Sequence, residues 1–318
     1  MADASDVFDT RRSIPAGASI DAWRAADGWL LRTFDWPAGG AARGSILFQC
    51  GRGDFFEKYL ESFAHWHAAG WRITSLDWRA QAGSGRATPL PNVGHIADFA
   101  HYIDDIRAFW SDWAAVADGP RVAFGHSMGG HLILRALAEK AIAPDAAVLV
   151  APMLGLHSPV GPRLGEALAK AMGRLGDSAR PAWKGNERPN TRFTRQQLLT
   201  HDPARYADEL WWQAQNPELV TGPPSWNWVM QGFESTRRLR DSPALAALAT
   251  PVLMLVAEAD QLVDPKAALA VAARLPDARV VRFGAESAHE ILREADPVRD
   301  RALGEIDRFL DSRARGRG

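Results

Sequence analysis

The sequence has few of the features that tie a protein to disulfide chemistry or to a membrane. Its 318 residues include a single cysteine, Cys50, which excludes an internal disulfide. No run of 18 apolar residues occurs, so the sequence predicts no transmembrane helix. Residues 1–6 are acidic and lack the apolar stretch of a secretory signal. We therefore expect a soluble, cytoplasmic protein.

The chain also lacks an excess of charge of either sign. It has 37 Lys and Arg against 38 Asp and Glu, a formal net charge of -1 at pH 7. Without a global positive field, we expect no nucleic-acid partner. No cluster of His, Cys, Asp and Glu has the spacing of a metal site, so we expect neither a metal nor a cofactor. The sequence leaves the oligomeric state open.

The most informative stretch is 122–134, where a short apolar run leads into Gly-His-Ser-Met-Gly and then into a run rich in Leu and Ala. This is the G-x-S-x-G pattern between a strand and a helix, which lifts the hydroxyl of Ser127 out of the sheet. Side chains at Gly125 and Gly129 would meet the neighbouring strand and helix. The helix begins beside Ser127, so the Met128 N–H points at negative charge formed there. The alternative is a glycine-rich turn of another α/β fold.

Strand-like apolar runs alternate with helical patterns over most of the chain. We expect strands at 29–36, 45–50, 71–78, 122–124, 146–152, 251–257 and 278–283, helices at 54–69, 96–116, 265–275 and 296–310, an N-cap at Asp54, and a mobile arm at 1–20. The alternation predicts an α/β protein with a mostly parallel, doubly wound sheet. Residues 153–240 interrupt it with many Pro, Gly, Arg and Trp residues. We interpret 1–152 and 241–318 as two parts of one core, and 153–240 as an inserted helical lid (cap).

A serine nucleophile needs a base and an acid that orients the base. In an open parallel sheet, ligands bind beyond the carboxyl ends of the strands, so both groups should follow later strands. Asp260 follows one such strand and His289 follows the next, in the order Ser, carboxylate, His. His289 is the predicted general base and Asp260 its orienting acid. Glu258 and Asp264 compete with Asp260, although Asp264 precedes a proline and is well placed to cap the next helix.

The negative charge that develops on the substrate needs a second N–H donor besides Met128. It should come from the loop after the second predicted strand, where Gly51 permits close approach, and we predict the amide of Arg52. His126 lies beside the nucleophile and is interpreted as a packing residue. Cys50 either lines the site or is a buried, inert thiol, which is the more common case.

With these residues placed, the sequence resembles the α/β-hydrolases of the lysophospholipase and monoacylglycerol lipase group over nearly its whole length. The resemblance is carried by 70–79, 125–130, 258–263 and 288–294 and, for the bacterial lysophospholipase L2-like proteins, by 192–194 and 202–206. Two motifs depart from the family: its usual His-Gly is Cys50-Gly51 here, and its Arg-Gly-x-Gly-x-Ser is Arg79-Ala80-Gln81-Ala82-Gly83-Ser84. Both departures lie around the site mouth and bear on substrate preference.

The resemblance implies an α/β-hydrolase fold and a serine hydrolase that cleaves carboxylic esters, either a lysophospholipid or a monoacylglycerol, with the lid setting substrate choice. The alternatives are a lid-bearing aminopeptidase or a carbon–carbon bond hydrolase with the same triad and, from another class, a non-catalytic binding module. Residues 156–240 hold 12 Arg or Lys against 8 Asp or Glu, and five tryptophans: Trp183, Trp211, Trp212, Trp226 and Trp228. Contact with an anionic lipid surface and a merely solvated basic face are equally compatible with this composition.

Overall fold

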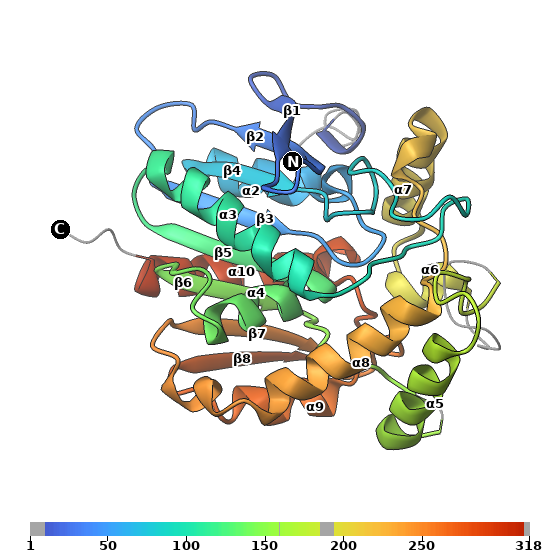
Figure 1. Ribbon diagram of the computed structural model, residues 1–318. Helices are drawn as coiled ribbons and strands as arrows, with labels where there is room; N and C mark the ends of the chain where they lie inside the picture. Colours follow the sequence, from blue (N-terminus) through green and yellow to red (C-terminus); the bar gives the residue numbers. More distant parts are fainter. Residues whose placement is uncertain (1–9, 159, 185–193, 315–318) are drawn as a thin grey trace.

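The computed structural model describes residues 10–158, 160–184 and 194–314. Its centre is an eight-stranded sheet in the order β1-β2-β4-β3-β5-β6-β7-β8 (Figure 1). The pairs β1–β2 and β2–β4 are antiparallel, and the pairs from β4 through to β8 are parallel, so the predicted mostly parallel sheet is confirmed. The strands are β1 (Ser19–Arg24), β2 (Leu30–Trp36), β3 (Gly44–Gln49), β4 (Trp71–Leu76), β5 (Arg121–His126), β6 (Ala146–Val150), β7 (Val252–Ala257) and β8 (Ala278–Phe283).

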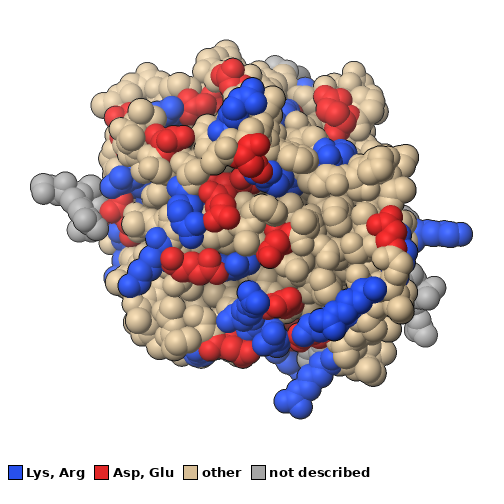
Figure 2. Space-filling view, viewed as in Figure 1, with Lys and Arg blue, Asp and Glu red and all other residues tan. Residues whose placement is uncertain are grey.

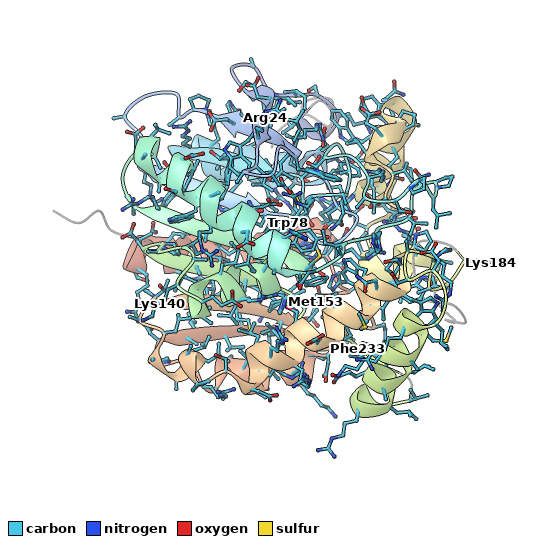
Figure 3. The ribbon with its side chains drawn as sticks, viewed as in Figure 1. Arg24, Trp78, Lys140, Met153, Lys184 and Phe233 are labelled. Atoms are coloured by element: carbon cyan, nitrogen blue, oxygen red, sulfur yellow. The ribbon has the colours of Figure 1, made fainter. Side chains whose placement is uncertain are left out.

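Helices cover both faces of this sheet. Because successive side chains of a strand point to opposite faces, Leu47 of β3 belongs to the core on the face covered by α3, α4 and α9, whereas Ile46 and Phe48 belong to the core on the face covered by α2 and α10. Figure 3 shows Trp78, which follows β4, in the interior, and Arg24 and Lys140 at the periphery. The helices are α2 (Leu60–Ala68), α3 (Ala100–Val116), α4 (Met128–Ala138), α5 (Pro162–Arg174), α6 (Arg195–Leu199), α7 (Pro203–Gln215), α8 (Trp226–Asp241), α9 (Pro265–Ala272) and α10 (Asp296–Arg313).

The segment between β6 and β7 contributes helices α5 to α8 and, within its described part, no strand of the sheet. Figure 1 shows α5, α6 and α7 gathered at one end of the sheet, with α8 running from that end back along the sheet. Helix α5 packs against α8. This arrangement places the segment over the end of the sheet at which the loops after β5, β7 and β8 emerge.

Two expectations are wrong. Residues 19 and 20, the end of the expected mobile arm at 1–20, belong instead to β1, which pairs along β2; residues 1–9 of that arm lie outside the described range. Asp54 caps no helix. The chain instead enters a short 3₁₀ turn, Phe56–Tyr59, and then α2, and the Asp54 carboxylate bonds elsewhere in the interior.

The surface carries no large field of one charge on the face that Figure 2 shows, where Lys and Arg side chains alternate with Asp and Glu. Among the described helices, none combines the length and the apolar character that crossing a membrane requires.

Candidate active site

The turn at Ser127 is strained. Its φ of 51° and ψ of -115° lie in a region that non-glycine residues rarely occupy. Three backbone hydrogen bonds hold it there: Ser127 donates to the Val150 carbonyl at 2.9 Å, and its own carbonyl accepts from Met153 at 2.9 Å and from His131 at 3.1 Å. The residue therefore sits on a fixed corner between β5 and α4.

Two glycines make this corner possible. A Cβ at Gly125 would lie 2.5 Å from the Gly130 nitrogen, and one at Gly129 would lie 2.3 Å from the carbonyl oxygen of Gln49. Both positions are closer than any side chain can approach a backbone atom, as the sequence indicated. The absence of side chains lets α4 start directly against the ends of β5 and β3.

His289 is bound to a carboxylate. Its Nδ1 lies 2.5 Å from Oδ2 of Asp260, and both side chains are buried. The other oxygen of Asp260 accepts the amides of Leu262 at 2.7 Å and Val263 at 3.1 Å, which fixes the carboxylate plane. Since Asp260 is bonded to Nδ1, Nε2 is the ring nitrogen that remains for proton transfer.

The two competing carboxylates lie elsewhere. Asp264 caps α9 by accepting the Lys266 amide at 2.9 Å, as its position before a proline suggested. Glu258 is exposed and lies 3.4 Å from Arg282. Of the three candidates, the structure brings Asp260 to His289.

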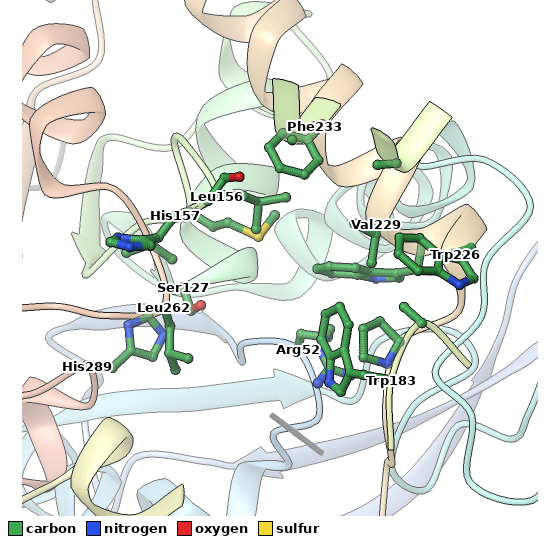
Figure 4. A pocket seen from close by; sticks show the side chains of 18 of the residues that line it. Arg52, Ser127, Leu156, His157, Trp183, Trp226, Val229, Phe233, Leu262 and His289 are labelled. Atoms are coloured by element: carbon green, nitrogen blue, oxygen red, sulfur yellow. The ribbon is translucent and has the colours of Figure 1, made fainter. Parts of the chain in front are cut away.

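Ser127 and His289 line one cavity of about 340 Å³. Figure 4 shows the Ser127 oxygen and the His289 ring at one side of this space, with Val229 and Phe233 across from them. The lining is largely apolar, and its side chains from the segment between β6 and β7 include Leu156, Leu168, Trp183, Trp226, Trp228, Val229 and Phe233. The loops after β5 and β8 thus bring the two groups to an apolar space that α5 and α8 help to enclose.

Of the two predicted oxyanion donors, Arg52 adjoins this space, and Met128 directly follows Ser127, which lines it. Met128 is the first residue of α4, and Arg52 lines the cavity. A Cβ on Gly51 would lie 3.1 Å from the Ser127 Cβ, so this loop rests against the Ser127 turn. The amides on both sides of Arg52 are fixed, Gly51 to Asp54 at 3.1 Å and Gly53 to Gln81 at 2.7 Å.

The structure also places Cys50 and two of the five tryptophans. Cys50 is fully buried, is absent from the cavity lining, and burial raises the pKa of its thiol well above the ordinary value, so it is the inert thiol. Trp211 and Trp212 pack against the N-terminal segment, where Trp212 donates to the Arg11 carbonyl at 2.9 Å. In the part of the chain that the structure describes, no three metal-ligating side chains converge.

Sequence reasoning missed a buried charged cluster beside the cavity, two of whose carboxylates, Asp54 and Glu290, also line it. Lys58 contacts Asp54, which lies four residues before it, and also Glu209 and Glu290, which lie far from it and from each other in the chain. Asp54 was interpreted as a helix cap and His126 as a packing residue, yet the two are bonded at 2.9 Å. No sequence spacing could have indicated contacts between residues 58, 209 and 290.

The mostly parallel sheet carries a strained serine between a strand and a helix, and a carboxylate-bound histidine on a later loop. Both line a largely apolar cavity, and this combination defines an α/β-hydrolase. A family profile described as "Serine aminopeptidase, S33" matches residues 40–296, and the chain belongs to this family.

Curated relatives of the chain include lysophospholipases, and solved structures share its fold. Lysophospholipase L2 of Escherichia coli (strain K12) is 31% identical over 280 residues, covering 82% of this chain and 78% of that protein. The probable lysophospholipase L2 of Haemophilus influenzae is 26% identical over 276 residues, 85% of each chain. A soluble variant of monoglyceride lipase from Saccharomyces cerevisiae, solved with a substrate analog, superposes with a TM-score of 0.74 at 17% identity, covering 95% of this chain and 98% of that one.

The His289–Asp260 pair predicts a pH-dependent contribution to stability. Burial lowers the pKa of His289. The Asp260 carboxylate with its hydrogen bond, together with Glu290 and Asp54, raises the pKa by more than burial lowers it, so the net pKa is above 6.5. Because the folded state binds this proton more tightly than the unfolded state, the protonated imidazole contributes its full stabilisation when the solution pH is below 6.5. The contribution is lost as the pH rises through the folded-state pKa of His289.

We therefore expect the difference in unfolding free energy between wild type and Asp260→Asn to be largest at pH 6 and to shrink toward pH 9, measured by urea titration at each pH. Asp264→Asn, which alters only a helix cap, is the control and should give a constant difference. An Asp260→Asn difference that is flat over this range would contradict the assigned pair.

Proposed function

We propose that the chain is a serine esterase that hydrolyses the acyl ester of a lysophospholipid or a monoacylglycerol. It is a carboxylic ester hydrolase of the α/β-hydrolase fold, and its curated relatives bear the names lysophospholipase L2 and monoacylglycerol lipase. The observation that carries the proposal is that Ser127 and the Asp260-bound His289 line the same apolar cavity.

In the proposed mechanism, His289 Nε2 takes the proton of Ser127 as the hydroxyl oxygen attacks the acyl carbon. The N–H groups of Met128 and Arg52 stabilise the negative oxygen of the tetrahedral intermediate. Collapse of this intermediate expels the alcohol, to which His289 gives its proton, and leaves an acyl group on Ser127. Water then attacks the acyl-enzyme as His289 takes its proton; the bond to Ser127 Oγ breaks, the carboxylic acid leaves, and His289 returns the proton to Ser127. Asp260 stabilises the imidazolium in both halves.

The charges around the cavity favour an ester over an aminoacyl amide. An aminopeptidase needs a carboxylate that faces the substrate's ammonium group. Asp54 and Glu290 are among the lining residues, but each is already bonded to Lys58. The remaining lining is mainly apolar, which suits an acyl chain.

We also propose that residues 153–240 act as a cap that meets a lipid surface through α5. Leu164 of α5 and Leu175, which directly follows the helix, are 60% and 61% exposed and lie outside the cavity lining. Val160 and Leu168 are half exposed as well, but they line the cavity. Helix α5 also carries three cations, Arg163, Lys170 and Arg174, against one Glu. An amphipathic helix of this kind fits the interface of a bilayer that contains anionic lipid.

Replacement of Ser127 by Ala should lower ester turnover by at least about 10⁴-fold, because the nucleophile is lost while the fold remains. Mass spectrometry of lipid extracts incubated with each protein measures the turnover and identifies the substrate head group. Ser158→Ala removes another serine that lines the cavity and should keep turnover close to wild type. Unchanged turnover in Ser127→Ala would refute the proposal.

The double variant Leu164→Ser/Leu175→Ser should bind phosphatidylglycerol-containing vesicles at least about tenfold more weakly in a co-sedimentation assay, since two large apolar groups no longer enter the bilayer. Neither residue lines the cavity, so turnover of a water-soluble ester should not change. The matched control, Leu30→Ser/Val116→Ser, removes two apolar side chains of similar exposure outside this segment, 46% and 62%. Equal vesicle binding by all three proteins would show that α5 does not reach the bilayer.

A further inference from the structure

The charged cluster beside the cavity joins the loops that carry the proposed catalytic groups. Its centre is the Lys58 ammonium, which is completely buried. The Nζ atom lies 2.5 Å from Asp54 Oδ1, 2.6 Å from Glu290 Oε1 and 3.0 Å from Glu209 Oε2. Asp54 belongs to the loop after β3, Glu290 directly follows His289, and Glu209 belongs to α7 of the segment between β6 and β7.

Asp54 extends these contacts to the nucleophile turn and to the predicted oxyanion loop. Its Oδ2 accepts the Gly51 amide at 3.1 Å and the Tyr59 hydroxyl at 2.8 Å, and lies 2.9 Å from His126 Nδ1. The Tyr59 oxygen is also 2.8 Å from His126 Nδ1. One carboxylate group thus fixes the residue before Arg52 and the residue before Ser127.

His126 in turn approaches the base. Its Nε2 lies 3.4 Å from the His289 carbonyl oxygen, and the two imidazole centres are 4.9 Å apart. Charged and titratable groups face this region from each element around it. They are Asp260 after β7, His126 at the end of β5, Asp54 and Lys58 after β3, Glu290 and Arg293 after β8, and Glu209 on α7.

The cluster is balanced in charge, which explains why it can be buried. Arg293 and Arg195 join Lys58 as cations, and Asp54, Glu209 and Glu290 are the anions. Although burial alone would raise it, Lys58 and His126 hold the pKa of Asp54 well below its usual range. The neighbouring cations likewise outweigh burial and lower the pKa of Glu209 to about 2. Asp54 is therefore a carboxylate in the working pH range.

We propose that Asp54, supported by Lys58 and Tyr59, is a positioning residue of the active site that sets the Arg52 amide and the Ser127 turn relative to the His289 loop. The inference rests on the proposed serine esterase function. A buried ion cluster of this kind costs desolvation, and a well-packed apolar cluster would often stabilise the fold equally well. Its contacts are with the three loops that must be in register for acyl transfer, which is where small displacements cost most in rate.

The test compares Asp54→Asn with a matched buried carboxylate, using a water-soluble p-nitrophenyl ester. Asp105→Asn removes a charge of similar burial from the buried pair with Arg79, away from the cavity. We expect Asp54→Asn to lower kcat about ten- to hundredfold with little change in KM, because an oxyanion donor acts mainly in the transition state. Asp105→Asn should lower the melting temperature and leave kcat within twofold.

The pH profile separates positioning from general destabilisation. Asp54 contributes to the raised pKa of His289, so the acid limb of kcat/KM should move to lower pH in Asp54→Asn and stay in place in Asp105→Asn. Should Asp54→Asn not fold, Tyr59→Phe keeps every charge and removes one hydroxyl from Asp54 and His126; it should lower kcat about three- to tenfold without moving the limb.

Ser127→Ala in the same assay tests the esterase proposal separately from the positioning role of Asp54. If its turnover equals that of wild type, the esterase proposal fails. If its turnover is lost while Asp54→Asn, or Tyr59→Phe in its place, keeps kcat within twofold, the esterase proposal stands and the positioning role of Asp54 is wrong.

Discussion

The close approach of α4 to the end of β3 is the contact on which the active site depends. A single methyl group at Gly129 would lie 2.3 Å from the Gln49 carbonyl oxygen. Because nothing but a hydrogen atom separates these backbones, the chain can turn at Ser127 in a conformation that costs about 1–3 kcal/mol. Three backbone hydrogen bonds offset this strain. The Ser127 side chain lines the cavity because these hydrogen bonds hold its backbone in a single conformation.

The groups around Ser127 are then oriented by two sets of buried charges. Asp260 binds the far nitrogen of His289, and the Lys58 cluster links the loops after β3 and β8 to α7. The same side of the segment between β6 and β7 is also tied down through its backbone, since Glu290 donates to the Leu199 carbonyl at 2.7 Å. Helix α5, by contrast, leaves large apolar side chains exposed. The part of the proposed cap around α6 and α7 is thus bonded to the loop that carries His289, whereas α5 exposes an apolar surface.

Local patterns in the sequence are sufficient for much of this description. The strand–turn–helix at Ser127 and the positions of Asp260 and His289 after later strands follow from periodicity and chain order, and the caps at Asp264 and the glycines at 125 and 129 follow from local sterics. Asp54 was expected to cap a helix because an acidic residue before an apolar stretch is a common cap signal. The prediction failed because its carboxylate bonds to Lys58 and also to His126, which lies 72 residues away in the chain. Strand β1 was missed because an exposed edge strand has weak apolar alternation.

In the proposed mechanism Ser127 is the nucleophile, and the amides of Met128 and Arg52 stabilise the oxyanion. A crystal structure of the protein inactivated with an alkyl fluorophosphonate tests this mechanism most directly, since the adduct mimics the tetrahedral intermediate. The account predicts phosphorus bonded to Ser127 Oγ, with one phosphonyl oxygen about 3 Å from the amide nitrogens of Met128 and Arg52 and His289 Nε2 adjacent. An adduct on another residue, or a phosphonyl oxygen turned away from both amides, would contradict it.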